Sequence, residues 1–186
     1  MLSVVIATQD NQRALLPTLA ALVAGAVGGL VREVILADAS SRDATVAIAD
    51  EAGCRLLNLA LPRGARLKAA ADAARASWLL FLQPGVVLEP SWVEEIRRFI
   101  EEVELRKAPH PKAGVFRAGP RGSATLEALA LLRAGLGAWP DAGQGLVIAK
   151  SLYAALGGHR DVRAPERDLL RRIGRKRLLR LRTGAI

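Results

Sequence analysis

The sequence contains one cysteine, Cys54, and only two histidines, His110 and His159, among its 186 residues. One thiol cannot form a disulfide within the chain, and these residues do not make up the Cys/His cluster of a structural zinc site. A Gly-x-Gly-x-x-Gly loop, a Walker A loop and a Gly-x-Ser-x-Gly elbow are also missing. These absences disfavour a dinucleotide enzyme, a P-loop NTPase and an α/β-hydrolase. The lack of disulfides suits a reducing, cytoplasmic setting.

The composition is that of a folded chain with a strong positive charge. Hydrophobic residues make up 51% of the sequence and charged residues 24%, which excludes a disordered chain and predicts one compact domain. Lys and Arg number 27 against 18 Asp and Glu, so the formal net charge is +9. Such an excess favours an anionic partner, which can be a nucleotide, a nucleic acid or a membrane surface.

Two segments resemble membrane or export signals only superficially. The N-terminus lacks the basic region of a secretory signal and is typical of a strand. Residues 14–31 carry no charge, but they include Pro17 and several glycines, which favours a helix buried against a sheet over a transmembrane span. The glycines Gly25, Gly28 and Gly29 are predicted to end that helix.

Apolar runs alternate with helical patterns through the first 90 residues. The patterns predict strands at 2–7, 33–37, 55–59 and 78–82, and helices at 13–24, 43–51 and 65–76. Continuous apolar strands separated by helices indicate an α/β fold, with a doubly wound, mostly parallel sheet and helices on both faces. Ligands of such sheets bind beyond the carboxyl ends of the strands.

The second half of the sequence is less regular. It predicts a helix from about 91 to 106, a connector at 108–112 and a strand at 115–117, followed by a helix at 125–136. Further on come a strand at 145–149, helices at 151–156 and 166–173, and a segment at 176–181 that is either a strand or an amphipathic extension.

Two carboxylates follow the second strand. Asp38 ends that strand, where a carboxylate can accept hydrogen bonds from a ribose or a base edge, so we predict a binding role for it. Asp43 lies three residues after Ser40, a spacing typical of a helix cap, and we favour that structural role.

Basic residues open the helix that follows the third strand. Arg63, Arg66 and Lys68 lie where a phosphate could dock on side chains and backbone N–H groups, although a solvated basic turn explains them equally well. Farther along, His159 follows two glycines, and a lone histidine in such a loop is more often at the surface than in a cleft. Glu166 is either a general base or simply a favourable charge at a helix start.

Most of the excess charge lies at the C-terminal end. Residues 166–186 contain eight Lys and Arg and two acidic residues, with leucines interleaved among them. This amphipathic tail could contact an anionic membrane surface, such as the inner face of a cell membrane. It has no aromatic residue for base stacking, which makes nucleic acid an unlikely partner.

Several motifs resemble those of the family 2 glycosyltransferases, in the same order along the chain. The similar segments are 3–11 (SVVIATQDN), 37–45 (ADASSRDAT), 63–71 (RGARLKAAA), 78–82 (WLLFL) and 142–158 (AGQGLVIAK followed by SLYAALGG). The resemblance implies a GT-A fold that binds a nucleoside-diphosphate sugar and passes the sugar to an acceptor hydroxyl. It also divides a single domain, 1–186, into a nucleotide-binding half (1–90), an acceptor-side half (91–165) and a basic C-terminal helix and tail (166–186).

The resemblance implies a role for each matching residue. The residues expected near the nucleotide are Thr8, Asp10, Asp38, Arg63, Arg66 and Lys68. Those expected at the acceptor or in the cleft are Gln83, Gln144 and His159. The family's catalytic carboxylate motif reads Ala-Pro-Glu-Arg-Asp here, and both possible alignments place Glu166 on one of the family's carboxylates, which makes it the best candidate for the catalytic base.

The acidic metal-binding motif of the family is replaced after the fourth strand by Gln83-Pro84-Gly85. Gly85 takes the place of the ligand aspartate, so no strong site for Mn²⁺ or Mg²⁺ is expected, and Glu89 is too far along to assume a replacement. Three hypotheses follow: a metal-independent transferase in which Arg63, Arg66 or Lys68 stabilises the diphosphate, a non-catalytic nucleotide-binding or partner-binding descendant, and a basic scaffold.

Overall fold

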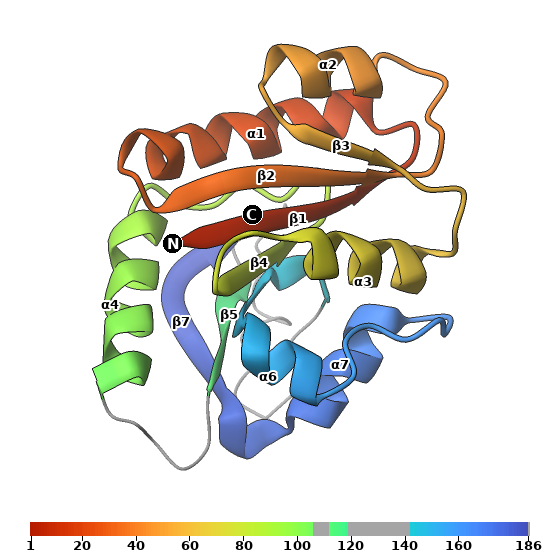
Figure 1. Cartoon of the computed structure of the whole chain (residues 1–186). Helices are drawn as coiled ribbons and strands as arrows, with labels where there is room; N and C mark the ends of the chain where they lie inside the picture. Colours follow the sequence, from red (N-terminus) through yellow and green to blue (C-terminus); the bar gives the residue numbers. More distant parts are fainter. Residues whose placement is uncertain (106–111, 119–141, 186) are drawn as a thin grey trace, which may run out of the picture.

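The computed structural model describes residues 1–105, 112–118 and 142–185. These residues form a sheet with strand order β3-β2-β1-β4-β6-β5-β7 (Figure 1). The strands are β1 (Leu2–Thr8), β2 (Val31–Asp38), β3 (Arg55–Asn58), β4 (Trp78–Leu82), β5 (Ala113–Ala118), β6 (Leu146–Ala149) and β7 (Leu178–Ala185). Strand β6 is antiparallel to β4 and β5, and the other neighbouring pairs are parallel. The predicted mostly parallel α/β sheet is therefore confirmed.

Helices cover both faces of the sheet (Figure 1). Helices α1 (Gln12–Val27), α2 (Thr45–Glu51) and α4 (Trp92–Leu105) contribute to one hydrophobic core, and α3 (Arg63–Ala73), α6 (Lys150–Ala155) and α7 (Pro165–Ile173) to the other. Strand β1 serves both cores, because Val4 and Ile6 face the first and Val5 and Ala7 face the second. This alternation explains why the strand is apolar at almost every position.

Helix α1 runs three residues beyond its predicted end. Gly28 and Gly29 end it as expected, and Gly29 has φ +67°. Gly25, in contrast, lies inside the helix, where a Cβ atom would collide with the Trp92 ring. Its predicted role as a stop is wrong, because a side chain at position 25 would exclude the aromatic ring from the core. Within the described residues, no helix has the length and apolar character needed to cross a bilayer.

The last part of the basic tail, after α7, is a strand and not an amphipathic extension. After a short 3₁₀ turn, Arg175–Arg177, it forms β7, which pairs in parallel with β5. Leu181 is buried, and Leu179 packs against the same core. The leucines that suggested a membrane-facing stripe are therefore core residues, and only the charged side chains remain for an anionic surface.

Strand β7 lies at the edge of the sheet, and two glutamates bind its backbone. Glu95 of α4 accepts hydrogen bonds from the backbone N–H groups of Arg182 (2.5 Å) and Thr183 (2.6 Å). Glu89 accepts one from Gly184 at 2.8 Å. These side chains tie the last strand to the segment 89–95. The predicted helix at 125–136 and most of the predicted connector at 108–112 lie outside the described residues.

Candidate functional site

The carboxyl ends of β1 and β2 are joined by Asp38, which is fully buried. Its carboxylate accepts hydrogen bonds from the Thr8 hydroxyl (2.7 Å), the Ser41 hydroxyl (2.5 Å) and the Ser41 backbone N–H (2.7 Å). All three donors belong to the protein, and the side chain has no exposed surface. Here Asp38 shapes the loop at the sheet edge, and its direct contact with a nucleoside stays a prediction.

Asp43 binds the backbone N–H groups of Gln12 and Thr45, the first residues of α1 and α2, each at 2.9 Å. A hydrogen bond from the Thr45 hydroxyl is the main reason why the pKa of the Asp43 carboxyl is lowered. Asp43 thus has a structural role, as predicted, but the expected capping box is not formed, because Ala44 is the N-cap of α2 and the Ser40 hydroxyl donates to Asn58 at 2.8 Å. Asp10, expected near the nucleotide, is exposed and binds the Arg42 backbone N–H at 2.7 Å.

An open groove of about 560 Å³ lies at the carboxyl ends of these strands, and its volume is within the usual range of ligand sites. The loops after β1, β2 and β3 and the first turn of α3 enclose it. Its walls are formed by Thr8, Gln9, Asn11, Ala39, Ala60, Leu61, Pro62, Arg63 and Arg66. We refer to this cavity as the groove. Of the residues predicted near the nucleotide, Thr8, Arg63 and Arg66 line it, whereas Lys68 is exposed elsewhere on α3.

Arg66 is the most unusual residue of the groove, because its side chain is buried with only 5% exposed. Its Nη1 donates hydrogen bonds to the carbonyls of Thr8 (2.6 Å) and Ala37 (3.0 Å). Its Nε is also buried but has no hydrogen-bond partner within the described part of the chain. Burial lowers the pKa of the guanidinium, and the neighbouring Arg63 lowers it further. An anion at this wall would satisfy a donor that is otherwise costly to bury.

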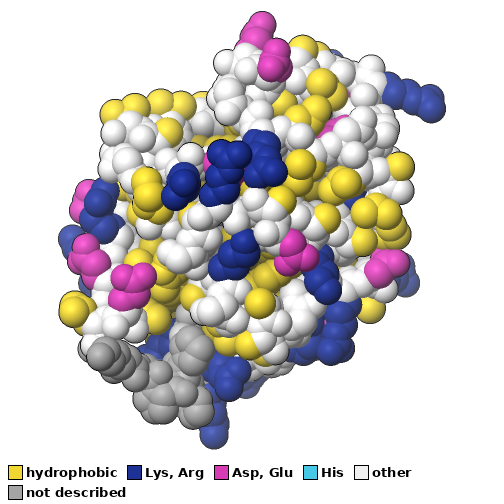
Figure 2. Space-filling view, in the orientation of Figure 1, with side chains coloured by type: hydrophobic (Ala, Val, Ile, Leu, Met, Phe, Trp, Pro, Cys, Tyr) yellow, Lys and Arg dark blue, Asp and Glu magenta, His cyan; other side chains and the backbone are white. Residues whose placement is uncertain are grey.

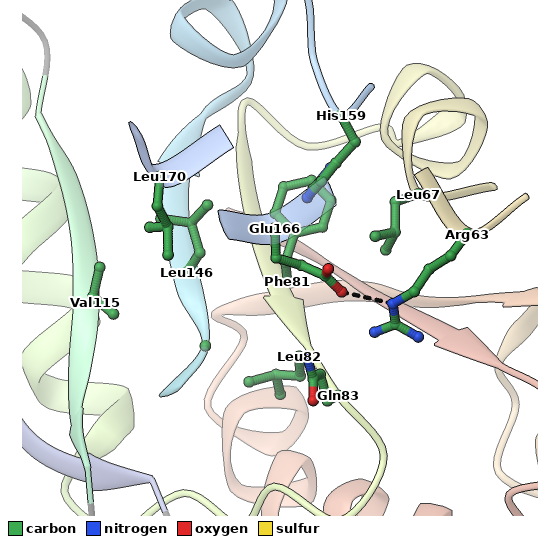
Figure 3. A pocket seen from close by; sticks show the side chains of 11 residues that line it. Arg63, Leu67, Phe81, Leu82, Gln83, Val115, Leu146, His159, Glu166 and Leu170 are labelled. Atoms are coloured by element: carbon green, nitrogen blue, oxygen red, sulfur yellow. Dashed lines mark hydrogen bonds and ion pairs between the residues drawn. The ribbon is translucent and has the colours of Figure 1, made fainter. Parts of the chain in front are cut away.

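A second, narrow cavity of about 20 Å³, less open to solvent than the groove, lies between the sheet and α7 (Figure 3), and we refer to it as the closed cavity. Most of its lining is apolar, and the full set is Arg63, Leu67, Phe81, Leu82, Gln83, Val115, Gly145, Leu146, His159, Glu166 and Leu170. The fold thus brings together three of the predicted acceptor-side or catalytic residues, Gln83, His159 and Glu166. Gln144 only precedes the lining residue Gly145.

Arg63 and Glu166 form an ion pair between the two cavities. The Arg63 Nε donates to Glu166 Oε1 at 2.6 Å, across 103 residues of sequence (Figure 3). The two side chains are 35% and 16% exposed, so the pair is partly shielded from water. Sequence reasoning gave each residue a role of its own and missed their contact. Figure 3 shows both side chains beside the closed cavity, and Arg63 also lines the groove.

His159 is buried, with 3% of its surface exposed, so its interpretation as an ordinary surface residue is wrong. Its Nδ1 lies 2.9 Å from the Tyr153 hydroxyl, and its backbone N–H donates to the same oxygen at 2.9 Å. The ring also packs edge-on against Phe81, with 4.7 Å between ring centroids. Burial lowers the pKa of this imidazole to about 4, so it is neutral at pH 7.

The loop after β4 does not fit a metal site. Gly85 has φ +93°, a conformation that strains an aspartate, and its N–H donates to the Ala14 carbonyl (2.8 Å) and the Thr18 hydroxyl (2.9 Å). Glu89, the next carboxylate, binds Gly184 on β7 instead. Across residues 1–105, 112–118 and 142–185, no group of three or more His, Cys, Asp or Glu could hold a metal ion.

The sequence of residues 3–105 matches the family model described as glycosyl transferase family 2. The chain belongs to this family. The match spans β1 through α4 and includes the loops that form the groove. No curated protein matches the sequence significantly.

Solved structures share the fold of this family 2 chain. A structure of S. aureus TarS, residues 1–349, has a TM-score of 0.73 at 14% identity, covering 97% of this chain and 57% of that one. Glucosyl-3-phosphoglycerate synthase from Mycobacterium tuberculosis, solved with Mn²⁺, UDP and glucosyl-3-phosphoglycerate, has a TM-score of 0.70 at 19% identity, covering 100% and 71%. The predicted GT-A-like fold is thereby confirmed, and the chain spans little more than half of the TarS structure.

Proposed function

We propose that this chain binds a nucleoside-diphosphate sugar in the groove and transfers the sugar to an acceptor hydroxyl. The observation that carries the proposal is the buried Nε of Arg66, which has no partner among the described residues. A diphosphate oxygen supplies the acceptor that this donor lacks, and a charge-assisted bond of this kind is strong. UDP is present in structures of the M. tuberculosis synthase, and a UDP-sugar in one of TarS, which supports the same ligand class here.

In this proposal, arginines stabilise the leaving group. Negative charge grows on the diphosphate as its bond to the sugar breaks, and fixed cations beside it lower the energy of that transition state. Arg66 is held rigidly by the backbone carbonyls of Thr8 and Ala37, so its position costs little reorganisation. Arg63 borders the same groove. The described residues do not fit a metal, so no step is assigned to one.

Glu166 is the proposed base for the acceptor hydroxyl. It lines the closed cavity but is paired with Arg63, which also lines the groove. A diphosphate in the groove competes with Glu166 for the Arg63 guanidinium. Nucleotide binding therefore frees the carboxylate to accept a proton from the acceptor.

The same ion pair also favours a second candidate, a nucleotide-binding protein without turnover. If Arg63 and Glu166 stay paired when the nucleotide is bound, the pair is structural and no base is available. The two candidates differ in one observable, which is release of sugar from the bound nucleotide.

Calorimetric titration with UDP, GDP and dTDP, first in EDTA and then in Mn²⁺, tests the groove. We expect at least one nucleotide to bind in EDTA, and Arg66→Lys to weaken it about tenfold or more, because lysine keeps the charge but lacks Nε. Lys68→Gln is the matched control, since it removes a charge from the exposed side of the same helix. Absence of binding by the folded wild-type protein under both conditions would contradict the proposal.

Turnover is measured as hydrolysis of the corresponding nucleotide sugar, with water as the acceptor. Saturable release of sugar that is lost in Glu166→Gln supports the transferase. Tight nucleotide binding with no release in either protein supports the non-catalytic candidate.

A further inference from the structure

A set of exposed cations lies along α7 and the segment that follows it. The set consists of Arg167 and Arg171 of α7, Lys176 of the 3₁₀ turn and Arg180 of β7, and we refer to it as the basic surface. Figure 2 shows dark-blue side chains gathered along the lower part of the molecule, where Figure 1 places α7 and the start of β7. Residues 166–185 contain eight Lys and Arg and two acidic residues, which gives a formal charge of +6.

Packing of the apolar residues places these cations on one side of the molecule. Helix α7 turns its apolar residues toward the second core, which leaves Arg167 and Arg171 on its outer side. Arg180 is paired in register with Val115, a residue of the same core, so it lies on the sheet face that α7 covers. The 3₁₀ turn joins these two elements. The basic surface therefore runs continuously from α7 to β7.

The two carboxylates of α7 are bound by arginines that do not belong to the basic surface. Glu166 is paired with Arg63 at 2.6 Å, and Asp168 accepts a hydrogen bond from Arg172 Nε at 2.8 Å. The acidic residues of this region thus already have cationic partners of their own. A group of exposed like charges favours an anionic partner, which relieves their mutual repulsion.

The apolar residues between these cations are not available to a partner. Leu169, Leu170 and Ile173 are buried in the second core, and Leu181 is buried in the first. A membrane would therefore be held by charge alone, without apolar side chains entering the hydrocarbon. Such contact weakens steeply as salt is added, because ions screen charges that stay in water.

Two features favour an anionic bilayer over a nucleic acid as the partner. Residues 160–185 contain no aromatic side chain on which a base could stack. The cations also come from a helix, a turn and a strand, whereas most DNA-binding proteins read a groove with one helix or one ribbon. Lipid headgroups move laterally in a fluid bilayer, so they can match cations in any arrangement.

We propose that the basic surface docks this protein on a bilayer of anionic phospholipids, whose headgroups pair with its guanidinium and ammonium groups. Docking does not involve the groove, so it stands whether or not the chain transfers a sugar. Each Lys or Arg that reaches an anionic bilayer strengthens binding about fivefold, and four of them together give roughly 500-fold.

Co-sedimentation of the full chain with lipid vesicles tests the docking surface. We expect binding to vesicles of phosphatidylcholine with about 30% phosphatidylserine, and little binding to phosphatidylcholine alone. The combined variant Arg171→Gln, Lys176→Gln and Arg180→Gln should bind the anionic vesicles roughly 100-fold more weakly, because three of the four cations are removed. Raising NaCl from about 0.1 M to about 0.5 M should release the wild-type protein.

The matched control is the combined variant Arg13→Gln, Arg32→Gln and Arg98→Gln. These three side chains are exposed but lie outside the basic surface, and their removal lowers the net charge of +9 by the same amount. We expect its vesicle binding to fall less than about threefold, and the urea midpoints of both variants to match that of the wild type. Equal losses of vesicle binding in the two variants would show that the total charge is responsible, which would overturn the proposal.

Other results would also overturn it. These are no binding to anionic vesicles in about 0.1 M NaCl, equal binding to phosphatidylcholine alone, or binding that persists in about 0.5 M NaCl. Tighter binding to a DNA duplex of about 20 base pairs than to vesicles, lost in the first variant, would assign the surface to nucleic acid instead.

The outcomes are separate from those of the proposed function. Vesicle binding is measured without nucleotide, and the first variant should keep the nucleotide Kd of the wild type, because its substitutions lie outside the groove. If vesicles bind and no nucleotide does, sugar transfer fails and the docking surface stands. If a nucleotide sugar is turned over and anionic vesicles do not bind, the transferase stands and the docking surface fails.

Discussion

The groove and the closed cavity lie on either side of one ion pair, and they differ in almost every physical property. The groove is open, about 560 Å³, and bordered by two arginines, whereas the closed cavity is about 20 Å³ and mostly apolar. Each is lined by a residue with a buried nitrogen that has no described partner, Arg66 Nε in the groove and His159 Nε2 in the closed cavity. The comparison teaches that the fold places a basic, open space and a small, mostly apolar one beside the same arginine, Arg63.

The substitution with the largest expected effect is Gly64→Ala, which disturbs both cavities. A Cβ atom at Gly64 would collide with the backbone carbonyl of Arg160, so the first turn of α3 would have to leave the loop before α7. We expect a loss of about 3 kcal/mol in the free energy of unfolding, measured in urea. Gly29→Ala is the comparison, because Gly29 faces open space and has the positive φ that Gly64 lacks, so its loss of about 1 kcal/mol reports backbone strain alone. Equal losses in the free energy of unfolding of the two variants would mean that the close contact between Gly64 and the Arg160 backbone does not affect stability.

Lowering the pH is expected to reduce the free energy of unfolding through His159, which lines the closed cavity. Burial lowers the pKa of His159 to about 4, and the charges of Arg172 and Arg63 add to this. Glu166 and Asp168 act in the opposite direction. The unfolded imidazole, with a pKa near 6.5, binds its proton more tightly, so stability falls as the pH drops from about 6.5 to about 4.

Urea unfolding at pH 7 and pH 5 measures this effect. Between pH 7 and pH 5, the free energy of unfolding should fall by about 2 kcal/mol more in the wild-type protein than in His159→Gln. Carboxylates with lowered pKa, such as that of Asp43, contribute little in this range because they titrate below it. A loss of the same size in both proteins would mean that the buried imidazole is not the group responsible.

The smallest effect is expected for the ion pair that separates the two cavities. A double-mutant cycle with Arg63→Gln and Glu166→Gln should give a coupling free energy of about 1 kcal/mol, because both side chains retain contact with water. Saturating nucleotide should reduce this coupling if the diphosphate draws Arg63 into the groove. A coupling unchanged by nucleotide would favour the non-catalytic candidate.

Local patterns were sufficient to predict most of the sheet and its covering helices. Apolar runs marked β1 to β4, and the spacing of Ser40 and Asp43 indicated a helix start close to that of α2. Gly25 was misinterpreted, because the reason for a glycine there is a ring 67 residues away, at Trp92. The leucines of β7 likewise read as a membrane-facing stripe until the pairing with β5 placed them in the core.

The site was predictable as a set of residues but not as a set of contacts. The order of motifs indicated Arg63, Arg66 and Glu166, yet no local signal shows that Arg63 binds Glu166. The burial of His159 depends on Tyr153, six residues earlier, whose hydroxyl meets the ring only after the glycine loop turns back. Contacts of this kind are set by tertiary packing, which periodicity and spacing do not encode.

The two glutamates that bind the backbone of β7, Glu89 and Glu95, have a consequence for association between molecules. An edge strand with open N–H groups is a template on which a strand of another chain can add. Here the N–H groups of Arg182, Thr183 and Gly184 already bind carboxylates. Burial opposes ionisation of Glu95, but hydrogen bonds from Thr183 and Arg182 outweigh it and lower its pKa. These N–H groups are therefore already paired along this stretch of the sheet, where a neighbouring molecule would otherwise begin a shared sheet.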